Sequence, residues 1–345
     1  MTEPATSSGD DRSRLADRYR RFARVETDGI SPRYTELAMA VADDEPTLEF
    51  LAGLPAAKQQ PNLLFAAWRA ALADGAPPGD AGEFLTRLHR DPDPVRAVML
   101  ARSNQMNEPA RCGVLVPLLS RIEAEEDRPL SLVEIGASAG LCLHPDRYRY
   151  RWQWTDGTEQ RVGDGDPEIA LTVDGPAPLP ERPVTVAWRG GLDLNPLELT
   201  DPADRTWLHT LIWPEHTHRA ERLAAAIETV TAIDPGERGK VVRADLRTGL
   251  ADLVAEAPSD TTVVVYHSAV LAYLPSRSEI DAVADQIGAL GVRWIANEAP
   301  GVFPDATGPW RETIGRDFAL LLDGVPVAAA GPHGQSLRWF ERRPR

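Results

Sequence analysis

A predicted strand that runs into a glycine-rich turn is the part of this sequence that most directly indicates ligand binding. The stretch SLVEIGASAGL, residues 131–141, is an apolar run that contains Glu134 and continues as Gly-x-x-x-Gly. Gly136 and Gly140 lack a Cβ, so the backbone there can take unusual dihedrals and a ligand can approach it closely. We expect a helix to follow the turn, with its first N–H groups unpaired and at the positive end of the helix dipole. The pattern is typical of a nucleotide-like ligand site, and a strand-to-helix turn with glycine for packing is the alternative.

His267 is the residue best suited to proton transfer. It follows the apolar run at 263–266, near the carboxyl end of a predicted strand, where open α/β sheets place functional groups. An imidazole side chain exchanges protons near neutral pH. Ser268 and Tyr273 would orient the ring or line a pocket, and Glu298, at the end of a later strand, is a further pocket candidate. A histidine packed and hydrogen-bonded at the sheet edge is the structural alternative.

A polar break separates two apolar helical patterns at residues 106–111. It contains Asn107, Glu108 and Arg111, Asn104 stands just before it, and Pro109 could begin the second helix. We predict that these side chains form a helix cap and a salt bridge. A contact with substrate is the alternative.

A second polar cluster, WPEHTHR, occupies residues 213–219. Glu215 and His218 lie three residues apart and could share one helix face, with His209 as a further metal ligand. No second cluster completes a metal site, so we predict none. A substrate contact by Glu215 or His216 is the other functional interpretation.

Strands and helices alternate after residue 130. Five apolar, β-branched runs suit strands that are covered on both faces: 131–136, 184–194, 241–246, 261–270 and 292–299. Helical patterns lie between them at 201–213, 215–232, 247–257 and 277–289. Two further runs, 318–324 and 336–341, look like strands joined without a long helix. This order predicts a doubly wound α/β sheet that ends in an antiparallel hairpin.

An insertion at residues 149–180 interrupts this order. Residues 149–158 alternate polar and aromatic side chains and end near an Asp-Gly pair. Residues 159–163 would then form the second strand, which runs back along the first. Such a pattern predicts a β-hairpin.

The chain is expected to contain a disordered polar tail at 1–12, a helical domain at 13–128 and an α/β domain at 129–345. Helical spacing of apolar residues begins near Arg14, and no stretch before residue 130 alternates like a strand.

Composition limits the classes of partner. The chain has 345 residues and a net charge of −15, which argues against general affinity for nucleic acid or acidic membranes. It has no secretion-like start and no apolar run near the length that spans a bilayer, so we expect a cytoplasmic protein with a small-molecule substrate. Cys112 and Cys142 are too few for a disulfide framework and are expected to be core residues. The sequence does not predict an oligomeric state.

The order of elements resembles the class I S-adenosylmethionine-dependent methyltransferase fold. The sequence also resembles an uncharacterised bacterial domain-of-unknown-function family with a methyltransferase-like core. The similar motifs are VEIGASAGL, HPDRYRYRW, LDLNPLEL, LIWPEHTHR and YHSAVLAYL. The resemblance covers roughly residues 14–341. It implies a Rossmann-like sheet of seven strands with an antiparallel terminal hairpin and S-adenosylmethionine as cofactor.

The resemblance also implies a role for each matching residue. Gly136, Ser138 and Gly140 would lie against the methionine part of the cofactor, with Glu134 beneath the turn. Asp193, at the end of the second strand, would accept hydrogen bonds from the ribose hydroxyls.

The glycine-rich turn and the acid that follows it depart from the family pattern in two ways. Ser138 stands where the family has a glycine, and Asp193 follows the turn at a greater distance than usual. Asp156 has closer to the usual spacing but falls in the predicted hairpin turn, so we prefer Asp193.

The remaining cofactor and substrate contacts follow from the later strands. Asp245 and Leu246 would border the adenine, while His267 and Ser268 would face the methyl group and the substrate. We therefore expect a methyltransferase that acts on an unidentified small molecule, with His267 as base and the substrate enclosed between the helical part and the sheet.

Three alternatives remain open. One is that the fold belongs to a catalytically inactive binding or scaffold protein. The stretch 136–140 also matches the Gly-x-Ser-x-Gly motif of serine hydrolases, with Ser138 as nucleophile and His333 as base. A dinucleotide-binding oxidoreductase fits less well, because G-x-G-x-x-G is absent.

Overall fold

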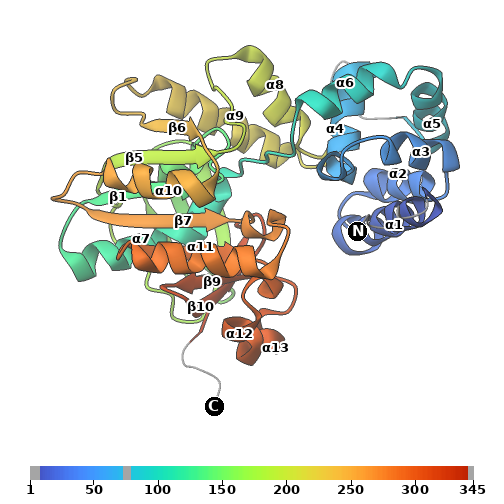
Figure 1. Ribbon diagram of the computed structural model, residues 1–345. Helices are drawn as coiled ribbons and strands as arrows, with labels where there is room; N and C mark the ends of the chain where they lie inside the picture. The colour runs from blue at the N-terminus through green and yellow to red at the C-terminus, as the bar shows by residue number, and fades with distance from the viewer. Residues whose placement is uncertain (1–7, 73–78, 341–345) are drawn as a thin grey trace. The chain divides into compact units, whose positions relative to one another are not determined.

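A computed structural model describes residues 8–72 and 79–340, which form two compact units (Figure 1). Unit 1 comprises Met1–Met106 and Pro202–Ala220, and unit 2 comprises Asn107–Asp201 and Glu221–Arg345. The division therefore does not fall at residue 128. Helix α7, Cys112–Glu126, belongs to unit 2 because most of its residues are buried and it packs on strands of the sheet. Pro202–Ala220, which comes after the second predicted strand, belongs to unit 1 instead.

Unit 1 is helical throughout its described residues. Its helices are α1 (Ser8–Arg21), α2 (Pro32–Ala42), α3 (Glu45–Ala52), α4 (Pro61–Leu72), α5 (Ala81–Arg90), α6 (Asp93–Ala101) and α8 (Pro202–Thr210), and a π-helical turn occupies Phe22–Thr27. Ser31, Asp44 and Asp80 cap α2, α3 and α5 by accepting hydrogen bonds from backbone N–H groups of the first turn. Residues 8–12, expected to be disordered, are part of α1, and residues 1–7 lie outside the described residues.

Unit 2 is built on an eleven-stranded sheet, so the expected number of seven strands is wrong. Its order is β3-β2-β4-β11-β10-β9-β8-β7-β1-β5-β6. The five predicted central strands are confirmed as β1 (Leu130–Ile135), β5 (Val186–Asp193), β6 (Lys240–Arg243), β7 (Thr262–Ser268) and β8 (Arg293–Glu298). They are neighbours and run parallel. The coarse prediction of a mixed α/β protein with a large, mostly parallel sheet is therefore correct.

The end of the chain forms three strands rather than a two-stranded hairpin. β9 (Phe318–Leu322) pairs antiparallel with β8, β10 (Val325–Ala330) with β9, and β11 (Ser336–Trp339) with β10. The sequence of β10 is VPVAAA, in which alanines lower the strand propensity and the register shifts after Pro326. These features explain why the sequence pattern did not indicate β10.

The insertion extends the sheet. β2 (Arg149–Trp154) and β3 (Glu159–Val162) form the predicted antiparallel hairpin, and β4 (Glu168–Asp174) pairs parallel with both β2 and β11. The inserted segment therefore supplies one end of the sheet.

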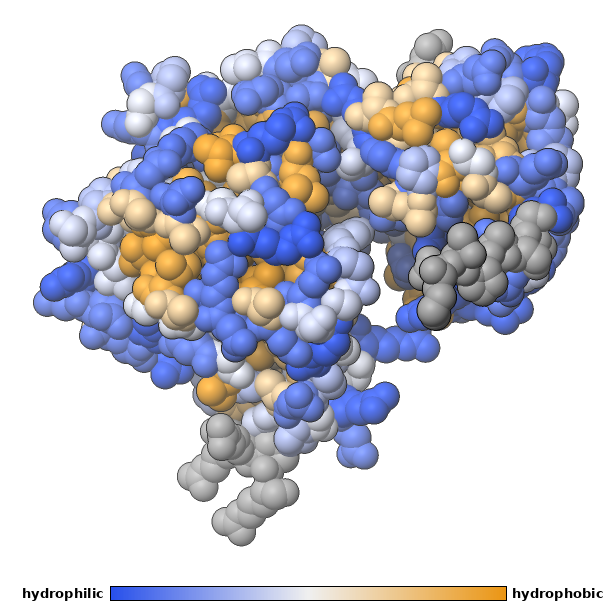
Figure 2. All heavy atoms as spheres, viewed as in Figure 1, coloured by the Kyte–Doolittle hydropathy of each residue, from blue (hydrophilic) through white to orange (hydrophobic). Residues whose placement is uncertain are grey.

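Helices cover both faces of the sheet. The longer ones are α7, α9 (Thr217–Ala232), α10 (Leu246–Ala255) and α11 (Arg277–Ala289). An apolar core around Val133, Val265 and Leu321 packs against α10 and α11. The visible surface is mainly hydrophilic, with scattered apolar patches (Figure 2). None of the described helices has the length and apolar character needed to cross a bilayer.

Candidate functional site

The carboxyl ends of the five parallel strands bring most of the predicted site residues to one edge of the sheet. Ile135 at the end of β1 is in register with Leu192 of β5 on one side and with His267 of β7 on the other. Parallel strands share the direction in which they end, so the segments after β1, β5, β6 and β7 all begin at this edge. We refer to it as the carboxyl edge.

The glycine-rich turn after β1 has left-handed backbone at alternate residues. The φ angles are +70° at Gly136, +53° at Ser138 and +75° at Gly140. The turn is followed by two short 3-10 helices, Leu141–Leu143 and Pro145–Arg147, and by no α-helix. The prediction of a helix here is wrong, and with it the argument from a helix dipole. The chain is held instead by tertiary bonds, including one from Leu141 N to Asn107 Oδ1 at 2.9 Å.

Close packing explains both glycines of this turn. A Cβ on Gly136 would lie 2.5 Å from Cγ2 of Val270, and a Cβ on Gly140 would lie 3.0 Å from Cγ2 of Val241. Contacts under 3 Å do not occur between real atoms of this kind, so any side chain at Gly136 would displace Val270. Packing of the turn therefore accounts for glycine here, as the structural alternative predicted.

Asp193 closes the turn from the neighbouring strand. Its Oδ2 accepts a hydrogen bond from Ser138 N at 2.9 Å, and its Oδ1 accepts one from Asn195 N at 2.8 Å. The side chain is only partly buried, and Leu194 beside it is 63% exposed. The carboxyl edge therefore presents a polar group, the Asp193 carboxylate, next to an apolar one, the Leu194 side chain.

Asp156, the alternative acid, lies in the turn between β2 and β3, where its Oδ1 accepts a hydrogen bond from Thr158 N. The strands β2 and β3 stand at the opposite end of the sheet order from β5. The structure therefore brings Asp193 to the glycine-rich turn and leaves Asp156 remote from it.

Glu134 is buried beneath the turn, at 6% exposure. Burial raises the pKa of its carboxyl group well above the ordinary value, because the charged form loses its hydration. Its Oε2 atom has no hydrogen-bond partner within the described ranges. The raised pKa favours the neutral carboxylic acid over the carboxylate, and the group keeps one buried oxygen without a partner among the described residues.

Asp245 follows β6 and begins α10. Its side chain accepts a hydrogen bond from the backbone N–H of Arg247 at 2.9 Å and forms an ion pair with the guanidinium of Arg247. The bonds from Arg247 lower the pKa of Asp245. Leu246 is half-buried beside it. Asp245 is thus a charged cap at the same edge, adjacent in the sheet to the strand that carries Asp193.

His267 is fully buried, and both its ring nitrogens are engaged. Trp294 Nε1 donates to Nε2 at 3.0 Å, so the ring proton lies on Nδ1, which donates to Glu298 Oε1 at 2.7 Å. In this arrangement neither nitrogen is available to a substrate. The geometry does not favour the predicted role in proton transfer and fits the structural alternative.

Glu298 also holds the loop that follows β7. Its Oε1 accepts hydrogen bonds from Val270 N at 2.9 Å and Leu271 N at 3.1 Å. Ser268 accepts a hydrogen bond from Asn297 Nδ2 at 2.8 Å, while Tyr273 is 61% exposed on the surface. The structure therefore places Ser268 at the carboxyl edge and Tyr273 on the surface.

The polar break at 106–111 supplies contacts beyond the predicted cap and salt bridge. Glu108 caps the short helix Pro109–Arg111 and accepts a hydrogen bond from Arg222 Nε at 3.0 Å. These contacts agree with the predicted cap and salt bridge. Arg111 additionally donates to two backbone carbonyls, Ser268 O at 3.1 Å and Pro332 O at 3.2 Å. The polar run between two apolar helices was the only signal for this role.

The WPEHTHR cluster lies within unit 1. Glu215 accepts hydrogen bonds from Ser31 Oγ at 2.9 and 3.0 Å, and the ring of His216 stacks on Trp213. In the part of the chain that the structure describes, no group of three or more His, Cys, Asp or Glu residues is arranged to hold a metal ion. Cys112 and Cys142 are both free and buried.

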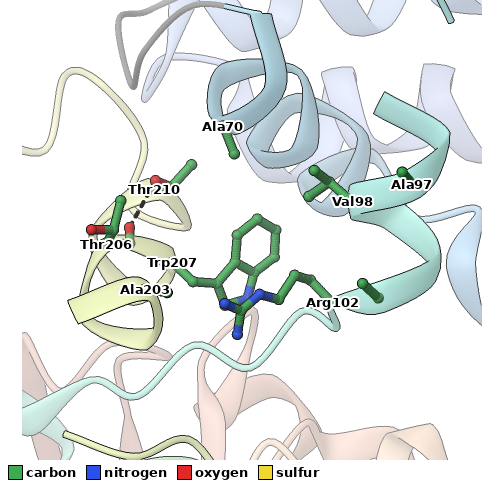
Figure 3. Close-up of a pocket in the computed structure, with 9 residues that line it drawn as sticks. Ala70, Ala97, Val98, Arg102, Ala203, Thr206, Trp207 and Thr210 are labelled. Carbon is green, nitrogen blue, oxygen red and sulfur yellow. Dashed lines mark hydrogen bonds between the residues drawn. The ribbon is translucent and has the colours of Figure 1, made fainter. Parts of the chain in front are cut away.

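A separate cavity of about 380 Å³ lies among α4, α6 and α8 of unit 1 (Figure 3). Alanine and valine side chains and the ring of Trp207 line most of it. The hydroxyls of Thr206 and Thr210 donate hydrogen bonds to backbone carbonyls of their own helix, and Arg102 donates one to the carboxylate of Asp204. None of the predicted site residues lines this cavity.

A comparison with family models identifies the chain. The model described as an uncharacterized protein conserved in bacteria, DUF2332, matches residues 16–339. The chain belongs to this family. The DUF2332 match spans both units and includes the whole carboxyl edge, so the predicted membership in an uncharacterised bacterial family is confirmed. No curated protein matches the chain.

Proposed function

We propose that this DUF2332 protein is an S-adenosylmethionine-dependent methyltransferase that acts on a small molecule, with the cofactor at the carboxyl edge. The observation that carries the proposal is the hydrogen bond between Ser138 N and Asp193 Oδ2, at 2.9 Å. It joins the glycine-rich turn of one strand to the acid that ends the next. These are the two elements that the methyltransferase resemblance assigns to one cofactor.

The chemistry of the edge fits such a ligand in three respects. Asp193 places a partly exposed carboxylate at the edge, and a carboxylate is the acceptor group that suits vicinal hydroxyls. Leu194 and Leu246 offer apolar surface beside Asp193 and Asp245, as a purine requires. The buried carboxyl of Glu134, whose pKa burial raises, has an oxygen without a partner among the described residues, in the strand that leads into the turn.

Bound S-adenosylmethionine would supply an electrophilic methyl group on a sulfonium centre. The protein's contribution would then be to bind the adenosine through Asp193 and Asp245, to fix the turn at Gly136–Gly140, and to hold the methyl acceptor in line. His267 would contribute by fixing the end of β7 through Glu298, not by contact with the acceptor.

A catalytically inactive binding protein is the second candidate. It is favoured by the packing of Val270 against Gly136 and by the full engagement of His267. The serine-hydrolase alternative has less support, because Ser138 is buried and no α-helix follows it as in a nucleophile elbow.

Calorimetric titration with S-adenosylmethionine and S-adenosylhomocysteine tests the proposal. We expect the wild type to bind both and Asp193→Asn to bind at least about tenfold more weakly, the effect of losing roughly 1.4 kcal/mol of charge-assisted hydrogen bonding. Asp156→Asn is the matched control, since it removes the same charge from a turn remote from the edge, and it should bind as the wild type does. No binding of either compound at millimolar concentration would refute the cofactor site. Binding with no methyl transfer to any acceptor would favour the inactive candidate.

A further inference from the structure

The loop between β10 and β11, residues 331–335, lies at the carboxyl edge although it belongs to the antiparallel part of the sheet. β9 runs antiparallel to β8, and β10 runs antiparallel to β9. Two reversals restore the direction, so β10 points the same way as β8, β7 and β1. The loop that follows Ala330 therefore begins at the edge where Gly136, Asp193 and Ser268 lie.

Arg111 ties this loop to the end of β7. Its guanidinium donates through Nη1 to Ser268 O at 3.1 Å and through Nε to Pro332 O at 3.2 Å. Since both bonds come from one planar group, Pro332 and Ser268 are held within the span of a single guanidinium. The residue after Pro332 is His333, so the backbone at His333 lies near the end of β7 that carries Ser268.

The loop is a tight, fixed turn. Gly334 has φ +75°, and a Cβ on it would lie only 2.2 Å from Ala110 O. Gly334 N donates to Gly331 O at 2.8 Å, and His333 N donates to Gln335 Oε1 at 2.9 Å. The backbone on both sides of His333 is thus fixed, which pre-organises the position of the imidazole.

His333 differs from His267 in its access to solvent. His267 is fully buried between Trp294 and Glu298, whereas His333 is only half-buried at the edge. A group that exchanges a proton with a substrate has to be accessible, and His333 is the more accessible of these two histidines. We infer that His333 is the residue that takes the proton from the methyl acceptor, an inference that rests on the proposed function.

The step balances for an acceptor that carries an O–H or N–H group. A bond forms between the acceptor oxygen or nitrogen and the methyl carbon, and the carbon–sulfur bond breaks with its electron pair left on sulfur. The acceptor's proton passes to His333, which later releases it to solvent. No redox partner or further co-reactant is needed.

Histidine modification with diethyl pyrocarbonate, read by peptide mass spectrometry, tests the location of His333. We expect His333 to be modified in the free protein and to be protected at least about fivefold by saturating S-adenosylhomocysteine, as occlusion at a binding site predicts. His89 is the internal control: it lies in unit 1, is bonded to Asp44 and should react equally with and without the ligand. Calorimetry under the same conditions establishes that S-adenosylhomocysteine is bound.

The outcomes separate the inference from the function on which it rests. Bound S-adenosylhomocysteine with unchanged modification of His333 would overturn the inference and leave the cofactor site intact. A His333 that does not react in the free protein would also overturn it, because a proton acceptor must be accessible. Absence of ligand binding would remove the proposed function and this inference together.

Substitution tests the chemical role. His333→Gln should bind S-adenosylhomocysteine within about twofold of wild type, while transfer of a tritiated methyl group from S-adenosylmethionine into a bacterial small-molecule extract should fall at least about 100-fold. His89→Gln should transfer at the wild-type rate. Wild-type transfer by His333→Gln would rule out proton acceptance by this residue, and lost ligand affinity would assign it a binding role instead.

Discussion

The indole N–H of Trp294 donates to Nε2 of His267 at 3.0 Å, and this single bond decides the state of the histidine. Because an indole nitrogen only donates, Nε2 has to accept, and the ring proton is confined to Nδ1. There it is directed at Glu298 Oε1, 2.7 Å away. The histidine at the end of β7 is therefore the middle member of a Trp–His–Glu hydrogen-bond chain, and the glutamate of this chain fixes the following loop.

Trp294→Phe should destabilise the protein by about 1–3 kcal/mol, because it leaves His267 Nε2 as a buried acceptor without a donor. Urea unfolding measures the change. Trp188→Phe is the matched control, since Trp188 is half-buried in β5. Equal losses in the two variants would show that the indole hydrogen bond to His267 contributes nothing specific.

Glu298→Ala should destabilise the fold more strongly, by roughly 3 kcal/mol or more. The substitution leaves three donors without their acceptor: His267 Nδ1, Val270 N and Leu271 N. Glu279→Ala removes a carboxylate that pairs with exposed Arg247 and should cost under about 1 kcal/mol. The comparison of unfolding midpoints checks the prediction. A small loss of stability in Glu298→Ala would contradict the role of Glu298 in holding His267 and the loop after β7.

Sequence reasoning succeeded where a local pattern and a global requirement coincide. The central strands are continuous apolar runs, which only a sheet covered on both faces accommodates, and all five were found. The contact between Ser138 and Asp193 was anticipated in outline, because adjacent parallel strands end side by side.

The errors arose where tertiary contacts override local signals. β10 is alanine-rich and contains Pro326, and only its pairing with β9 and β11 makes it a strand. The turn after β1 continues as 3-10 helices because partners distant in sequence, such as Asn107, hold it. The engagement of His267 depends on Trp294, 27 residues away, and no spacing rule connects the two.

Gly136→Ala should be more destabilising than Gly324→Ala, although both glycines have left-handed φ angles, +70° and +80°. The backbone strain costs about 1–2 kcal/mol in each case. At Gly136 the new Cβ also meets Val270 Cγ2 at 2.5 Å, while at Gly324 nothing lies within 4 Å. We expect an extra loss of about 1–3 kcal/mol at Gly136.

Adding Val270→Ala to Gly136→Ala should recover part of that extra loss and none of the backbone strain. Thermal unfolding of the two single variants, of Val270→Ala and of the double variant gives the coupling. Strictly additive effects would mean that Val270 does not fill the space beside the turn.

Glu134 should make the protein less stable as pH rises above the ordinary carboxyl pKa of 4.5. Burial raises the pKa of Glu134 in the folded state, so above pH 4.5 the folded protein binds more protons than the unfolded chain. Stability then falls by up to about 1.4 kcal/mol per pH unit until the folded pKa is reached. Glu134→Gln, which is neutral throughout, should lose less stability than the wild type between pH 5 and pH 8, and parallel curves would contradict a neutral Glu134.

His144 should produce the opposite dependence on the acid side. Burial, with a smaller contribution from Arg189, Arg147 and Arg238, lowers the pKa of His144 from 6.5 to about 3. Below pH 6.5 the unfolded chain therefore binds a proton that the folded protein does not, and stability is lost as pH falls from 6.5 toward 3. The loss between pH 7 and pH 5 is about 2 kcal/mol by this linkage. His144→Gln carries no titrating group, so its urea-unfolding free energy should change less over that interval, and a wild-type slope in the variant would show that His144 is protonated in the fold.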